Sequence, residues 1–129
     1  MLIRRIHRAK FERAKLVHPE LTPTSYSILN ALAEVGSQRS TDLADMFAID
    51  KGAVSRQVQI LEDLDLIERT PDPDDGRAAR LSLTEVGLQR MHAVIEQRRI
   101  RFEDRLSDWT TPEVDELVGL LARYNRSLS

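Results

Sequence analysis

Apolar residues recur at the spacing of an α-helix over most of this chain and alternate with polar residues in one central region. Helices are predicted over 1–18, 22–35, 41–47 and 51–64, and two more between residue 84 and the C-terminus. The alternating runs 66–70 and 79–83 predict two short strands. The expected order is therefore four helices, a hairpin and two helices.

Residues that satisfy free backbone groups mark the expected helix ends. Serine and threonine side chains accept hydrogen bonds from the first helical N–H groups, and glycine suits the residue after a helix. The predicted caps are Thr22 followed by Pro23, Gly36, Ser40, Thr84, and Thr110 with Glu113. These residues divide the chain without a long linker.

The helices 41–47 and 51–64, joined by residues 48–50, form a helix-turn-helix pattern. At 100° per residue, the second helix turns its apolar residues Val54, Val58 and Leu61 inward. Its outward stripe is small or hydrogen-bonding, as on a helix that reads the major groove of DNA. An ordinary solvated face remains the alternative. The stripe consists of Gly52, Arg56, Gln59 and Asp63, with Ser55 and Ala53 toward its edges.

The two strands are expected to form a protruding hairpin, or wing. Asp75-Gly76 predicts a tight turn with positive φ angles, which would place Arg77 at the tip. One arginine on a protruding hairpin suits the minor groove, and Asp75 is expected to hold its guanidinium by an ion pair. The alternative is an ordinary surface salt bridge. For DNA binding, the carboxylates of Asp72, Asp74 and Asp75 must turn away from phosphate.

The terminal helices carry more apolar surface than one compact domain covers, so a homodimer is expected; a purely intramolecular stripe is the alternative. The fifth helix is predicted to turn Leu88, Met91, Ile95, Phe102 and Leu106 inward. The last helix places Val114, Leu117, Val118, Leu121 and Tyr124 on one side.

Composition narrows the class. The chain has no cysteine, which excludes disulfides and thiol sensing, and no apolar run approaches membrane-spanning length, so a cytoplasmic location is expected. Neither a metal-ligand cluster nor a recognised nucleophile motif occurs, so no enzyme is predicted. The basic block at residues 1–15 is expected to be a solvated or dimer-flanking helix face rather than a membrane surface.

Charge argues against DNA binding unless it is sorted in space. The net charge is −2, and residues 39–84 contain ten acidic side chains against six basic ones. The six are Arg39, Lys51, Arg56, Arg69, Arg77 and Arg80. A DNA-binding lobe requires its positive charges on one surface.

Residues 66–84, LIERTPDPDDGRAARLSLT, resemble the wing signature of the MarR family (multiple antibiotic resistance regulators), above all in Asp75-x-Arg77 and in Leu83-Thr84 followed by Gly87. Val54-Ser55-Arg56 and Leu21-Thr22-Pro23 extend the likeness over nearly the whole chain. The resemblance implies a dimeric winged-helix regulator that sometimes responds to a small aromatic or anionic ligand. Gly52 stands where this family often has a hydrogen-bonding residue.

The sequence thus predicts a mostly helical α+β fold in a single domain, 1–129. Its winged helix-turn-helix lobe spans 22–87, with a recognition helix at 51–64 and a wing at 66–83, and its dimerisation helices span 1–20 and 88–129. We expect a transcription regulator, most simply a repressor, which binds double-stranded DNA and needs no cofactor. The alternative is a winged-helix protein-interaction module that no longer binds DNA.

The predicted DNA contacts are Ser40, Lys51, Gly52, Ser55, Arg56, Gln59 and Arg77, braced by Asp75. The predicted dimer contacts are Leu2, Ile6, Ile95, Phe102, Leu117, Leu121 and Leu128.

Overall fold

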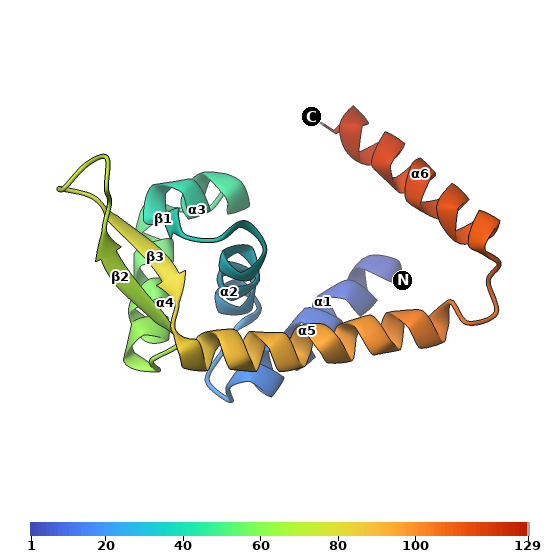
Figure 1. Ribbon diagram of the computed structural model, residues 1–129, viewed down its shortest axis with the longest axis horizontal. Helices are drawn as coiled ribbons and strands as arrows, with labels where there is room; N and C mark the ends of the chain where they lie inside the picture. The colour runs from blue at the N-terminus through green and yellow to red at the C-terminus, as the bar shows by residue number, and fades with distance from the viewer. Residues whose placement is uncertain (129) are drawn as a thin grey trace. The chain divides into compact units, whose positions relative to one another are not determined.

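The computed structural model describes residues 1–128, which form six helices and three strands (Figure 1). Two compact units are distinguished, residues 1–95 and 96–128, and α5 runs through the boundary between them. None of the helices formed by residues 1–128 has the length and apolar character needed to cross a membrane. The elements are α1 (Leu2–Val17), α2 (Pro23–Val35), β1 (Gln38–Arg39), α3 (Ser40–Phe47), α4 (Lys51–Asp63), β2 (Ile67–Pro71), β3 (Ala79–Leu83), α5 (Glu85–Arg105) and α6 (Thr111–Ser127).

The mostly helical fold with a small sheet is confirmed, and the sheet has one strand more than expected. Its order is β1-β3-β2, with both pairs antiparallel. In the predicted hairpin Arg69 faces Leu81, and on the other side of β3 Gln38 faces Leu81 as well. The additional strand is only two residues long, which is too short to show an alternation of apolar and polar residues in the sequence.

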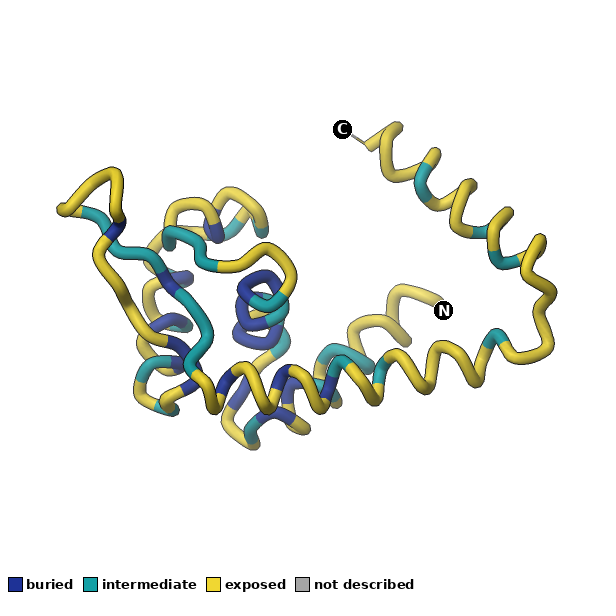
Figure 2. The backbone as a smooth tube through the Cα atoms, viewed as in Figure 1, coloured by how far each residue is buried: buried dark blue, intermediate teal, exposed yellow. Residues whose placement is uncertain are grey.

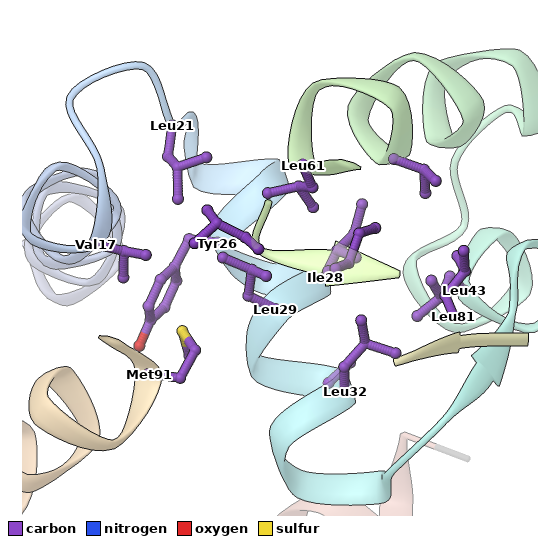
Figure 3. Packing of buried hydrophobic residues seen from close by; sticks show 14 of the residues in the cluster. Val17, Leu21, Tyr26, Ile28, Leu29, Leu32, Leu43, Leu61, Leu81 and Met91 are labelled. Atoms are coloured by element: carbon purple, nitrogen blue, oxygen red, sulfur yellow. The ribbon is translucent and has the colours of Figure 1, made fainter. Parts of the chain in front are cut away.

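The core of the first unit surrounds α2, the helix with the most buried residues in the described chain (Figure 2). Its Ile28 and Leu29 are fully buried, and Leu43 of α3, Leu61 of α4 and Leu81 of β3 close the core around them (Figure 3). At the other end, Tyr26 lies beside Val17 of α1 and Met91 of α5 (Figure 3). Burial of these aliphatic side chains, at about 25 cal/mol per Å² of apolar surface, holds the helix-turn-helix against the wing.

Most of the predicted caps are confirmed. Thr22 Oγ1 accepts the N–H of Ser25 at 3.2 Å, and Thr110 forms a capping box with Glu113. Gly36 ends α2 with φ +87°, which favours glycine. Ser40 is not an N-cap, because α3 begins at Ser40 itself. The residue before it, Arg39, is extended as part of β1.

A turn forms at Asp75-Gly76, where the N–H of Ala78 donates to the carbonyl of Asp75 at 3.0 Å, but it is not the predicted tight hairpin turn with positive φ angles. Gly76 has no positive φ, and the strands end at Pro71 and Ala79, so the tip is the wider loop 72–78. The ladder ends with Pro71 opposite Ala79, and Pro73, two residues further on, has no N–H with which to continue it toward a two-residue turn. The loop is closed by the N–H of Asp72, which donates to the carbonyl of Ala78 at 3.1 Å.

The inward face of α5 also differs from the prediction. Gly87, Met91 and Val94 are buried, whereas Leu88 and Phe102, both predicted to face inward, are exposed. A Cβ on Gly87 would lie 2.1 Å from the carbonyl oxygen of Leu66. The missing side chain thus lets α5 approach the start of β2, and this approach rotates Leu88 outward.

Candidate nucleic-acid interface

Helix α4 is fixed at its start and along one side. The Asp50 carboxylate accepts the N–H of Ala53 at 3.2 Å, which satisfies one free donor of the first turn. As predicted, Val54, Val58 and Leu61 are fully buried. The opposite side is therefore solvent-exposed in a fixed orientation. The exposed predicted contacts are Lys51, Gly52, Ser55, Arg56 and Gln59.

Gly52 leaves space at the start of this face. A Cβ at that position would lie 2.8 Å from Asp50 Oδ2 and 3.5 Å from Arg56 Nη1. The guanidinium of Arg56 and the capping carboxylate thus flank a position without a side chain. The small residue gives Arg56 room at the end of α4 that a recognition helix presents to DNA.

The C-terminal half of the same face has fewer side-chain groups free to contact DNA. Gln59 donates from Nε2 to the Asp63 carboxylate at 2.9 Å, so part of its hydrogen-bonding capacity is already used. Asp63 adds a negative charge on the outward stripe. The cationic and uncommitted groups of α4 therefore lie in its first half, at Lys51, Ser55 and Arg56.

The wing joins α4 through β2, which contacts it directly. Arg69 of β2 donates to Glu62 of α4 at 2.7 Å, a partly exposed ion pair. Beyond β2 and β3 the loop 72–78 extends away from the helices (Figure 1) and carries the exposed Arg77. Asp75 does not hold the guanidinium as predicted: its Oδ1 accepts the backbone N–H of Arg77 at 3.0 Å. The carboxylate thus orders the loop backbone.

A cluster at the root of the wing was not predicted. The Asp72 side chain is fully buried, and its Oδ2 accepts from Arg39 Nε at 2.8 Å and Arg80 Nη1 at 3.4 Å. Arg80 also donates from Nε and Nη2 to the side chain and carbonyl of Ser37. The Arg39 hydrogen bond, followed by that from the Asp74 backbone, holds the pKa of Asp72 well below its usual range, and Asp72 raises the pKa of Arg39. Asp72 is therefore ionised at neutral pH and turned away from solvent.

These pairs sort the charges of residues 39–84. Arg39 and Arg80 are paired with Asp72, and Arg69 with Glu62. In the described part of the chain, the other three basic residues of this segment form no ion pair: Lys51, Arg56 and Arg77. The uncompensated positive charges are therefore on the outward side of α4 and at the tip of the wing. Ser40, also predicted as a contact, is half-buried at the start of α3.

The terminal helices expose the apolar residues assigned to a dimer. Leu2 is 72% exposed, Leu121 is 52% exposed, and no residue of α6 is buried. Ile6, Phe102 and Leu128 are exposed as well, while Ile95 and Leu117 are intermediate. On the outer part of α5, between Ile95 and Phe102 of the predicted apolar stripe, Arg99 forms ion pairs with Glu96 and Glu103.

Comparisons with known proteins agree with this geometry. A family model described as MarR family matches residues 20–78. YxaD of Bacillus subtilis, an HTH-type transcriptional regulator, is 37% identical over 83% of this chain and 75% of its own length. The HTH-type transcriptional repressor NicR of Pseudomonas putida is 30% identical over 69% of this chain and 56% of its own length. The crystal structure of MarR matches with a TM-score of 0.76 at 25% identity, covering 98% of this chain and 86% of that one.

Proposed function

Because the chain belongs to the MarR family of helix-turn-helix transcription regulators, we propose that it represses transcription as a homodimer on a pseudo-palindromic operator. The family and these relatives are DNA-binding regulators, not enzymes. The observation that carries the proposal is the sorting of charge: the unpaired cations of residues 39–84 lie on α4 and on the wing tip. The role of NicR as a transcriptional repressor supports repression rather than activation.

Helix α4 reads the major groove through its first half. Arg56 and Ser55 carry side chains that donate to base edges, and Lys51 suits a phosphate at the helix start. Gly52 brings the α4 backbone close to the DNA beside the Arg56 guanidinium. A bidentate contact from Arg56 to guanine contributes about 1–3 kcal/mol of discrimination between bases.

The wing tip enters the adjacent minor groove. Arg77 is exposed, and its backbone is held by Asp75. A narrow, A·T-rich minor groove concentrates negative potential and attracts a single arginine without reading a particular base. Preference for A·T flanks is therefore expected to depend on Arg77.

The exposed apolar faces of α1 and α6, with the outer part of α5, support a homodimer. A monomer would leave Leu2, Phe102 and Leu121 in water, which is unfavourable for a stable soluble chain. A two-fold axis would place the two α4 helices about one DNA turn, roughly 34 Å, apart. A small aromatic or anionic effector would release DNA only if it bound more tightly to a dimer whose two α4 helices are separated differently from those of the DNA-bound dimer. The expected location is the cytoplasm, where the protein meets its DNA.

The test begins with isolation of bound genomic fragments and sequencing of the operator. Fluorescence anisotropy then measures the affinity of the wild type, Arg77→Ala and Arg56→Ala for the operator and for random DNA. Both variants are expected to lose about tenfold or more on the operator. Arg69→Ala is the matched control, since Arg69 is already paired with Glu62; its loss of affinity should be well below tenfold and equal on the operator and on random DNA.

Three outcomes would contradict the proposal. Wild-type affinity of Arg77→Ala excludes the wing role, and an equal loss by Arg56→Ala on operator and random DNA reduces Arg56 to a phosphate contact. Absence of DNA binding at low salt excludes the function and favours an interaction module, because phosphate contacts strengthen as salt falls. Sedimentation equilibrium tests the assembly, where a mass of 14.8 kDa instead of twice that value would exclude the homodimer.

A further inference from the structure

We propose that Asp72 is a positioning residue, which ties the tip of the wing to the start of α3 and thereby holds Arg77 in the orientation that binds DNA. The inference rests on the proposed function of the wing. It concerns the orientation of the wing, which is set by residues other than the proposed DNA contacts. Asp72 itself is buried at the base of the loop and is not one of the proposed DNA contacts.

One oxygen of the carboxylate joins the wing to the helix-turn-helix. Asp72 Oδ2 accepts from Arg39, the residue directly before α3, and from Arg80 on β3. Arg80 extends this link to the Ser37 hydroxyl and carbonyl, ahead of β1. The root of the wing is thus attached to the segment that leads into α3, which is packed against α4.

The other oxygen orders the tip. Asp72 Oδ1 accepts the backbone N–H groups of Asp74 at 2.8 Å and Asp75 at 3.3 Å. Asp75 then accepts the N–H of Arg77, and its carbonyl accepts the N–H of Ala78. A continuous series of hydrogen bonds therefore runs from Arg39 through one carboxylate to the backbone of Arg77.

This arrangement has a physical reason beyond stability. A buried carboxylate is costly unless it is paired, and a buried ion pair often stabilises a fold no more than apolar packing does. A protruding loop without such a link samples many orientations, and the entropy lost when DNA orders the loop then weakens binding. Pro71 and Pro73, on either side of Asp72, restrict the same loop further.

The test uses Asp72→Asn, which retains an oxygen but removes the charge that holds Arg39 and Arg80. The control is Glu62→Gln, which removes one negative charge from the same lobe and frees Arg69. On electrostatics alone both variants should bind DNA more tightly, because each removes a charge that repels phosphate. Positioning predicts opposite signs: about tenfold weaker operator binding for Asp72→Asn, and equal or tighter binding for Glu62→Gln.

A double-mutant cycle with Arg77→Ala separates positioning from a general loss of structure. If Asp72 acts through Arg77, Asp72→Asn should cost no further affinity in the Arg77→Ala background. If Asp72→Asn does not fold, Arg39→Gln replaces it in the test. The loss of operator affinity caused by Arg39→Gln should likewise disappear in the Arg77→Ala background. An undiminished loss in that background overturns the inference, as does wild-type affinity of Asp72→Asn. Wild-type affinity of Arg77→Ala by itself contradicts the proposed function of the wing instead.

Discussion

Replacement of Gly87 by alanine tests the contact that joins the wing to α5. Gly87 lies in the first turn of α5, and a Cβ there would be 2.1 Å from the Leu66 carbonyl oxygen and 3.0 Å from its carbon. The same oxygen accepts the N–H of Thr84 at 3.1 Å. The obstacle is backbone, so no side-chain rotation relieves it, and α5 must move by more than 1 Å from residue 66 to restore ordinary contact.

The magnitude follows from three contributions. Alanine is favoured over glycine inside a helix by about 1 kcal/mol. Forcing a methyl group into a packed contact costs about 1–3 kcal/mol, here toward the upper end because backbone must shift. Loss of the Thr84 hydrogen bond costs about 1 kcal/mol more. The expected net destabilisation is about 2–3 kcal/mol, which lowers the melting temperature of a chain of this size by roughly 10 °C.

Thermal and urea unfolding at one fixed protein concentration measure this effect, since assembly shifts apparent stability. Two other glycines provide matched controls. Gly76→Ala meets nothing within 4 Å and has no positive φ, so it should be neutral or stabilising by about 0.5 kcal/mol. Gly36→Ala also has space but at φ +87°, and should cost about 1–2 kcal/mol. Equal stability of Gly87→Ala and Gly76→Ala would refute the close approach of α5 to residue 66.

Three further outcomes follow from the packing, the caps and the ionised carboxylate. Leu61→Ala truncates a fully buried residue of α4 and should cost about 2–5 kcal/mol in urea unfolding. Thr22→Ala removes the acceptor for the Ser25 N–H and should cost about 1 kcal/mol in the same assay. The folded-state pKa of Asp72 is lowered by Arg39, so its stabilisation is complete above the unfolded-state pKa of about 4 and is lost as pH falls toward the folded value. The stability difference between the wild type and Asp72→Asn should therefore be largest near neutral pH and shrink below pH 4; a constant difference would contradict this.

Local patterns predicted the parts of the fold that depend on near neighbours. The inward residues of α4 follow from helical periodicity, since Val54, Val58 and Leu61 share one side of any helix through them. The caps Thr22 and Thr110 were equally predictable, because their partners lie three residues away. The same applies to the strands of the wing, whose alternation is local.

The parts that were missed depend on contacts between distant residues. Asp72, in a run of aspartates and prolines, has the composition of a solvated loop, and its strongest partner in the buried position is Arg39, 33 positions earlier. β1 exists because β3 offers it an edge. The orientation of α5 was mispredicted because an apolar period is equally satisfied by Leu88 or by a helix rotated toward Gly87. Only the contact of Gly87 with residue 66 decides between them.

Net charge is misleading for the same reason. Of the ten acidic residues between 39 and 84, Asp72 and Glu62 neutralise arginines within the lobe. Asp42 and Asp50 lie at helix starts, where carboxylates accept backbone N–H groups and favour the positive end of the helix dipole. Phosphates respond mainly to charge within about 10 Å at 0.1 M salt, so the local sign near α4 and the wing tip matters more than the sum. A lobe that is acidic by count can therefore still present Lys51, Arg56 and Arg77 as cations without an ion pair, because the carboxylates of Asp72 and Glu62 are paired with other arginines and those of Asp42 and Asp50 lie at helix starts.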